Sequence, residues 1–160
     1  MTRRVVVTGL GLVTPVGLTV DESWTNLLAG VSGAAPITKF DPVRSSVRFA
    51  CEVKGFDPLP YIDKKEARRY DLFAQYGLAA AHQAMVQAGL AEPGTINAAK
   101  AGCIIGAGIG GMQTFTDNVE AYLTKGPDRV SPFFVPMFIP DIAAGLASIL
   151  LQSQAFFTAL

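Results

Sequence analysis

The spacing of apolar residues along the chain predicts three strands. A continuous apolar run at residues 5–8 predicts a strand that is buried on both faces. Apolar and polar residues alternate over residues 47–53, which predicts a strand with one face on the core, and Cys51 falls on that buried face. A third apolar run at residues 101–105 predicts another buried strand.

Helical periodicity occupies the stretches between these strands. The pattern predicts a short helix over residues 21–29 that stops at Gly30. It also predicts a long helix over residues 63–88 that stops at Gly89, with small residues that favour close packing. A further helix is predicted from Met112 onward, because apolar residues recur there at spacings of three and four.

The C-terminal third of the chain is apolar and rich in proline. Residues 127–141 predict an extended segment, and Asp141 is expected to begin a last apolar helix. The predicted order is strand, helix, strand, long helix, strand, helix, helix. This order favours a layered α/β domain.

Composition narrows the classes of protein that fit this pattern. Half of the 160 residues are hydrophobic and 16% are charged, which indicates a folded domain and excludes disorder. Thirteen basic residues balance thirteen acidic ones, so the net charge points neither to nucleic acid nor to a membrane surface. No window reaches the roughly 18 apolar residues of a membrane span, and we expect no signal peptide. The chain has two cysteines without a C-x-x-C spacing, which predicts free thiols in a cytoplasmic protein. Its single histidine, His82, excludes a His-rich metal site and is expected to have a structural role.

Residues 103–111, CIIGAGIGG, contain glycines with the spacing G-x-G-x-x-G. A dinucleotide-binding turn has this spacing, but it also needs a second strand that ends in an acidic residue about 20 residues later. The residues that follow here, including TKGPDRVSPFFVP, provide no such strand. Glycine also permits close approach of the backbone to another segment or a ligand. That interpretation is favoured, with Ile109 as a gate on an apolar channel, and dinucleotide binding is kept as an alternative.

Four basic residues gather at the start of the predicted long helix: Lys64, Lys65, Arg68 and Arg69. Helical spacing places them on one cationic face. Such a face is either a solvated surface paired with neighbouring acids or a docking patch for an acidic protein, whose association it would accelerate.

Four motifs occur along the chain in one order and spacing: RRVVVTGLGLVTPVG, KKEARRYDLFAQYG, IIGAGIGG and SPFFVPMFIPDIAAG. Together they resemble the N-terminal part of the β-ketoacyl-acyl carrier protein synthase II family, the elongating condensing enzymes of bacterial fatty acid synthesis. The resemblance covers roughly residues 2–145. It implies a thiolase-like fold of two similar α/β halves, of which this chain would hold an incomplete N-terminal half with α/β/α layers.

The resemblance also implies an activity and a partner. The family is a group of acyltransferases that extend an acyl chain by decarboxylative Claisen condensation with malonyl-acyl carrier protein. Its members are usually homodimers and need neither a cofactor nor a metal. The positions of Lys65, Arg68, Arg69 and Arg129 match basic positions that receive acyl carrier protein, whereas Asp128 departs from a basic residue often found beside the last of them.

The same resemblance assigns two residues to the acyl pocket. Ile109 matches the residue that closes this pocket in the family. Phe134 matches an aromatic residue that lines the same region near the dimer interface, although an ordinary core aromatic would fit its sequence pattern equally well. No cofactor-binding and no metal-binding residue is implied.

No catalytic residue can be transferred by the resemblance. The family uses a cysteine at a helix N-terminus, where the helix dipole favours the thiolate, together with two histidines. The cysteine position lies just beyond residue 160 and the histidines lie farther on, so the chain resembles a part that stops before the nucleophile. Cys51 and Cys103 lie in predicted strands and do not match. The chain alone is therefore expected to be inactive, and a non-catalytic chain that binds a synthase or a carrier protein is the alternative.

The residues after Gly145 do not align with the family pattern. We expect a boundary there, with residues 1–145 as a partial synthase region and residues 146–160, LASILLQSQAFFTAL, as a divergent tail produced by a frameshift or a gene-end artefact. A partial fold exposes sheet edges and apolar helix faces. Poor solubility is the expected consequence.

Overall fold

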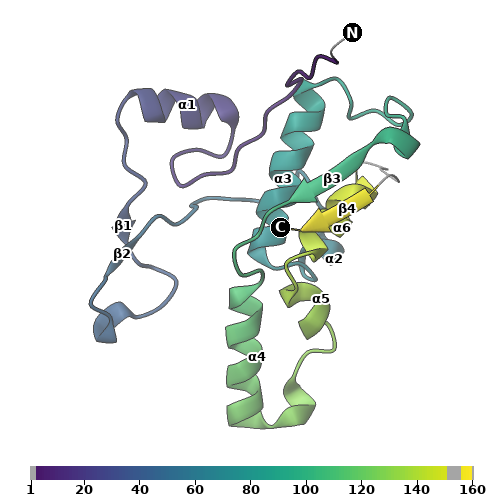
Figure 1. Ribbon diagram of the computed structural model, residues 1–160. Helices are drawn as coiled ribbons and strands as arrows, with labels where there is room; N and C mark the ends of the chain where they lie inside the picture. The colour runs from purple at the N-terminus through teal and green to yellow at the C-terminus, as the bar shows by residue number, and fades with distance from the viewer. Residues whose placement is uncertain (1–2, 151–155, 160) are drawn as a thin grey trace.

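The computed structural model describes residues 3–150 and the backbone of residues 156–159. In chain order the elements are α1 (Val20–Leu28), β1 (Ala35–Pro36), η1 (Pro42–Arg44), β2 (Phe49–Ala50), α2 (Lys64–Ala67), α3 (Leu72–Gln87), η2 (Ala98–Lys100), β3 (Gly102–Ile105), α4 (Met112–Lys125), η3 (Pro127–Arg129), α5 (Phe134–Phe138), α6 (Ile142–Leu150) and β4 (Phe156–Ala159). Figure 1 shows two lobes, a small one with α1, β1 and β2 and a larger one with the other helices and β3 and β4. Within the described part of the chain, no helix is both long and apolar enough to cross a membrane.

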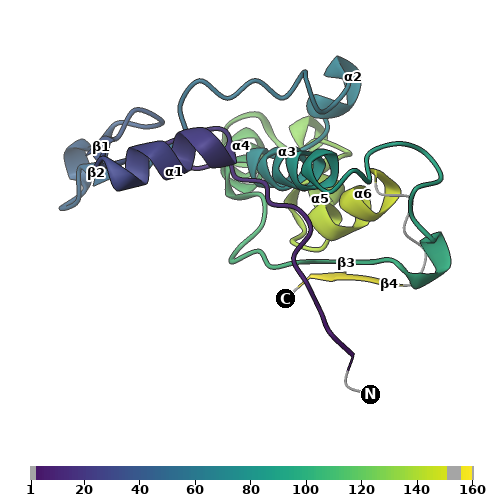
Figure 2. The same ribbon diagram turned by 90° about the horizontal axis from the view of Figure 1, so that it is seen from above.

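Strands β3 and β4 form a parallel pair in the larger lobe, with Gly102 opposite Phe156 and Ile105 opposite Ala159. Figure 2 shows this pair lying along one side of α3 and α6. Parallel strands require a long crossover connection that packs back onto the sheet. Helices α4, α5 and α6 lie in that connection, so the predicted layering of helices on strands is confirmed.

Helices α3 and α6 pack closely because their facing side chains are small. Ala74 and Ala79 on α3 are fully buried, and so are Ala143 and Ala147 on α6. Methyl side chains let two helix backbones approach more closely than branched ones do. The core cluster at this junction consists of Ile62, Leu78, Cys103 and Ala147.

The strand predicted at residues 5–8 does not form. Val5 and Val7 are 92% and 79% exposed, and no described strand pairs with them. An apolar run becomes a strand only when a neighbour satisfies its backbone hydrogen bonds. β3 forms as predicted, but only one of its faces is covered, since Cys103 is buried and Ile104 is exposed.

Side-chain amides of α3 hold the N-terminal arm, defined here as residues 3–12. The backbone N–H of Leu10 donates to Oε1 of Gln87 at 2.6 Å. The backbone N–H of Leu12 donates to Oε1 of Gln83 at 3.1 Å. These two bonds attach the arm to α3 through the backbone donors of residues 10 and 12.

The long helix predicted over residues 63–88 is two helices. α2 ends at Ala67, and α3 begins at Leu72 with Asp71 as its N-cap. The Asp71 carboxylate accepts a backbone N–H of the first turn of α3 at 3.4 Å, which satisfies a donor that a helix start leaves free. The predicted C-terminal stop is confirmed, because Gly89 has a φ of +69°.

The strand predicted over residues 47–53 is only two residues long in the small lobe, where β2 pairs with β1 in antiparallel fashion. Cys51 was predicted on its buried face and is exposed instead. A two-residue ladder offers no sheet face that could bury this thiol. The helix before it agrees with the prediction, since α1 follows an N-cap at Thr19 and the chain turns at Gly30 with a φ of +69°.

Residues 127–141 were predicted to be extended, but they contain η3 and the short helix α5. Pro127 and Pro136 each lie in the first turn of one of these helices, where a missing N–H removes no helical hydrogen bond. The backbone N–H of Ser131 donates to Oδ1 of Asn118 at 2.8 Å. This bond folds the segment back onto α4. The apolar helix predicted after Asp141 is confirmed as α6.

Candidate functional site

The basic segment, Lys64, Lys65, Arg68 and Arg69, lies on α2 and the turn that follows it. The expectation that it opens one long helix was wrong, because the chain turns before Asp71 starts α3. Lys64, Lys65 and Arg68 are exposed, whereas Arg69 is half-buried. The segment is therefore a short, solvent-facing cationic corner.

Arg69 is the member of the basic segment that already has partners. Its Nη1 lies 3.2 Å from Oε1 of Glu66. Its guanidinium carbon lies 5.1 Å from the ring centroid of Phe133, at the start of α5. Arg69 thus links α2 to α5 through an ion pair and a cation–π contact.

Glu66 is held from its other side by Tyr70. The Tyr70 hydroxyl donates to Oε2 of Glu66 at 3.0 Å. Partial burial raises the pKa of Tyr70, and the hydrogen bond to the Glu66 carboxylate and its negative charge raise it further. The phenol stays protonated at neutral pH and keeps donating to the carboxylate.

Arg129, the fourth predicted docking residue, lies apart from the other three along the fold. It is exposed in η3, directly after α4 ends, next to Asp128. Figure 1 places this turn at the far end of α4, away from the glycine-rich turn where α4 begins. The structure therefore brings Lys65, Arg68 and Arg69 together and leaves Arg129 at a separate point.

The glycine-rich turn packs against backbone, as the second interpretation of the motif expects. Gly110 has a φ of +84°, and a side chain there would collide with the carbonyl oxygen of Phe138. The backbone N–H of Gly111 donates to that same oxygen at 2.9 Å. The glycines fit the turn to the end of α5.

A carboxylate of the chain itself occupies the start of α4. Oδ2 of Asp71 accepts the backbone N–H of Thr114 at 2.8 Å and the Thr114 hydroxyl at 2.7 Å. A dinucleotide phosphate at this helix start would meet that negative charge instead of free N–H groups. The geometry therefore disfavours the dinucleotide alternative. Asp71 is 8% exposed, and sequence reasoning missed its role, although an Asp just before an apolar helix is an N-cap signal.

The two predicted acyl-pocket residues lie on opposite sides of the contact between the glycine turn and α5. Ile109 is 62% exposed on the turn. Phe134 belongs to an aromatic cluster in which its ring centroid lies 6.1 Å from that of Phe115 and 5.7 Å from that of Phe138. Phe134 also lines an open cavity of about 240 Å³ beside α4, and Ile109 is not among the residues that line it.

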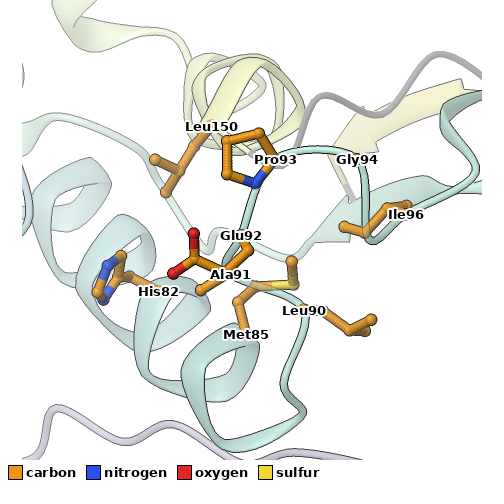
Figure 3. A pocket seen from close by; sticks show the side chains of 9 residues that line it. All are labelled: His82, Met85, Leu90, Ala91, Glu92, Pro93, Gly94, Ile96 and Leu150. Carbon is orange, nitrogen blue, oxygen red and sulfur yellow. The ribbon is translucent and has the colours of Figure 1, made fainter.

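A second, smaller cavity of about 60 Å³ lies between α3, α6 and the loop after α3 (Figure 3). Figure 3 shows His82, Met85 and Glu92 around it. The His82 ring packs edge-to-face on Tyr61, with ring centroids 5.6 Å apart. The structural role expected for His82 stays a prediction. Within the described residues no cluster of three or more His, Cys, Asp or Glu side chains could hold a metal ion.

Neither cysteine has the surroundings of a nucleophile. Cys51 is exposed in the small lobe, where it follows β2. Cys103 is buried within β3, and burial raises the pKa of its thiol. A reactive cysteine needs the opposite, a helix N-terminus or a cation that favours the thiolate.

Residues 2–159 match the family described as beta-ketoacyl synthase, N-terminal domain. The chain is 52% identical over 148 residues to a 3-oxoacyl-[acyl-carrier-protein] synthase 2 from Vibrio cholerae serotype O1, covering 92% of this chain and 36% of the relative. It is 44% identical over 152 residues to a protein of the same name from Synechocystis sp., covering 95% of this chain and 36% of the relative. The chain thus spans little more than a third of the length of these curated relatives.

Solved structures share this fold. The ishigamide ketosynthase/chain length factor matches 97% of this chain and 39% of its own with a TM-score of 0.88 and 28% identity. A type II PKS acyl-carrier protein in complex with its ketosynthase matches 100% of this chain and 42% of its own with a TM-score of 0.71 and 24% identity. The expectation of a partial thiolase-like fold is confirmed.

Proposed function

Because the chain belongs to the β-ketoacyl synthase family, whose N-terminal domain it matches, we propose that it provides the carrier-docking corner and part of the acyl-pocket wall of a fatty acid condensing enzyme. The reaction is the condensation of an acyl group with malonyl-acyl carrier protein, with loss of carbon dioxide. The observation that carries this proposal is the match of residues 2–159 to the N-terminal domain of this family. It is supported by 52% identity over 148 residues to a relative named 3-oxoacyl-[acyl-carrier-protein] synthase 2.

The basic segment is the docking corner in this proposal. Lys65 and Arg68 are exposed, and among the described residues neither takes part in an ion pair. Exposed cations without an acidic partner attract an acidic protein and raise its association rate. Arg129 adds a second contact point at the end of α4.

The turn and the aromatic cluster form the acyl wall in this proposal. In this proposal Ile109 closes the acyl pocket from the glycine-rich turn and Phe134 lines it from α5, so the acyl pocket extends beyond the cavity of about 240 Å³ that Phe134 lines and Ile109 does not. The turn and the aromatic cluster are in direct contact, because the backbone N–H of Gly111, two residues after Ile109, donates to the carbonyl oxygen of Phe138 in that cluster. In the homodimer that the family resemblance implies, the exposed part of α5 would meet the partner subunit.

The chemistry of carbon–carbon bond formation does not come from the described residues in this proposal. Cys103 is buried with a raised pKa, and Cys51 has no helix start beside it. The chain would act in the cytoplasm, where both thiols stay reduced. The boundary at Gly145 and the origin of the tail stay predictions, although the family match continues to residue 159.

Binding to a purified, fluorophore-labelled acyl carrier protein tests the docking function. Lys65→Gln and Arg68→Gln are each expected to weaken binding about two- to fivefold, because each removes one exposed cation from the contact. Raising the salt concentration should weaken binding further, since exposed charges are screened. Lys100→Gln removes a cation that is also exposed but lies outside the basic segment, and it is the matched control. Wild-type chain that fails to bind the carrier, or equal losses in the control, would refute the proposal.

A non-catalytic binding chain is the second candidate, and the surroundings of the two cysteines favour it. A radiolabelled acyl-transfer assay on this chain tests what both candidates assume, namely that neither cysteine accepts an acyl group. Acylation of Cys51 or Cys103 would show that this chain carries a nucleophile after all. Co-purification with a full-length synthase without acylation would support the binding role.

A further inference from the structure

We propose that Glu66 is an internal competitor for Arg69 and that it limits how tightly the basic segment binds an acidic carrier protein. The inference rests on the docking function proposed above and concerns the regulation of that same surface. Its basis is that Arg69 has an ion-pair partner among the described residues, whereas the other cations of the basic segment do not.

Arg69 is the one cation of the basic segment for which the structure describes an ion pair. Oε1 of Glu66 lies 3.2 Å from Nη1 of Arg69, and the contact is a hydrogen bond as well as an ion pair. Oε2 of Glu66 accepts the Tyr70 hydroxyl at 3.0 Å. With both carboxylate oxygens engaged, Glu66 is oriented toward Arg69 instead of toward solvent.

The guanidinium is also fixed from a second direction. Arg69 lies over the ring of Phe133 at 5.1 Å, so the cation is positioned at the start of α5. An incoming carboxylate or phosphate therefore binds an arginine whose side chain is already oriented by the Phe133 ring. Docking exchanges one anion for another at this arginine, and the Phe133 contact can persist through the exchange.

The exchange is feasible because the pair is accessible. The side chains of Arg69 and Glu66 are 41% and 38% exposed. Ion pairs at this degree of exposure are weak, and an outside anion can displace their acidic member. A buried pair would instead have to expose an uncompensated charge during the exchange.

Glu66 also lowers the net positive charge of the basic segment, so a control must separate this charge effect from competition for Arg69.

Asp63 provides a matched comparison, because it lies at the other end of α2, is exposed and makes no side-chain capping hydrogen bond. Asp63→Asn removes one negative charge beside the same cations and leaves the Arg69–Glu66 contact in place. The difference between the Glu66→Gln and Asp63→Asn variants isolates the competition from the change in net charge.

The experiment measures the affinity of the full 160-residue chain for a fluorophore-labelled acyl carrier protein by fluorescence anisotropy. Glu66→Gln is expected to bind about two- to fivefold tighter than wild type, which is the range that an exposed ion pair can supply. Asp63→Asn should produce less than half of that gain. Arg69→Gln should cost more affinity in the Glu66→Gln background than in wild type, because in that background the carrier binds Arg69 without first displacing Glu66.

The outcomes separate this inference from the docking function. An equal cost of Arg69→Gln in both backgrounds, or an equal gain from Asp63→Asn and Glu66→Gln, overturns the competition while docking stands. Loss of all binding in wild type and Glu66→Gln alike overturns the docking function and the competition together. Circular dichroism of each variant checks that the surface substitutions leave the helices intact.

Discussion

At the scale of single residues, the two cysteines differ in a way that their sequence context does not reveal. Cys51 lies in an alternating pattern that predicts burial, yet it is exposed, because β2 ends one residue before it. Cys103 is buried between β3 and the helices above it. Burial, and not the local pattern of residue types, sets the reactivity of each thiol.

We expect iodoacetamide to modify Cys51 at least about tenfold faster than Cys103 at pH 8, because the Cys103 thiolate is disfavoured by burial and must wait for local opening. Peptide mass spectrometry after timed quenching measures both rates in one sample. Comparable rates would show that β3 is not packed as described.

The raised pKa of Cys103 also predicts an alkaline loss of stability. Above about pH 9 the thiol ionises in the unfolded chain while the folded thiol stays protonated, so the free energy of unfolding falls as pH rises through the raised value. The raised pKa of Tyr70 adds a similar loss at higher pH. Urea titrations from pH 7 to pH 10 on wild type and Cys103→Ala test this, and the variant should lose less stability over that range.

At the scale of elements, the glycine-rich turn shows how one motif can serve two unrelated structures. Its spacing matches a phosphate-binding turn, but the start of α4 is occupied by the Asp71 carboxylate and the turn packs against α5. Gly110 is the position where both backbone conformation and space require glycine. Gly108 has open space around it.

Gly110→Ala is therefore expected to destabilise the chain by about 2 kcal/mol or more, because it combines a left-handed backbone with a collision against the Phe138 carbonyl. Gly108→Ala is the matched control and should change stability by less than about 1 kcal/mol. Urea unfolding followed by circular dichroism measures both. Equal effects in the two variants would show that the turn is not pressed against α5.

Element types were easier to predict from the sequence than element lengths. Helices α1, α4 and α6 and strand β3 lie where periodicity placed them. Two of the failures involve partners that lie far away in the sequence. Residues 5–8 have the composition of a strand but no described neighbour, and Asp71 divides the long helix while its carboxylate is held by Thr114 of α4.

In the candidate site too, the features set by local sequence could be predicted and the contacts between distant segments could not. Helical spacing led to the basic segment, and the family resemblance assigned the two pocket residues, whose individual roles stay predictions. The Glu66–Arg69 pair has the helical i, i+3 spacing that a sequence can suggest. The Phe133 ring over Arg69 and the Asp71–Thr114 contact join distant segments, and only the fold reveals them.

At the scale of the whole molecule, the described surface contains much apolar area. Val5, Val7, Leu123 and Ile149 are all more than 70% exposed. Exposed apolar patches together with an uncovered strand face are typical of surfaces that bind another protein or aggregate.

We expect the isolated chain to self-associate at micromolar concentration and to bind a hydrophobic dye such as ANS. Sedimentation velocity over a range of concentrations measures the association. Replacing Val5 and Val7 with Thr should lower dye binding, because it removes exposed methyl groups and keeps the shape of the arm. A monomer that melts cooperatively and ignores the dye would contradict this expectation.

The attachment of the N-terminal arm to α3 determines how the molecule would respond to mechanical load. The hydrogen bonds of Leu10 and Leu12 to two glutamine side chains follow one another along the arm. A force applied to the amino end would reach them one after the other, as in unzipping, so each would break at low force. Pulling on the parallel β3–β4 pair along its strands would instead shear its backbone bonds together, so the arm would peel away long before the sheet yields.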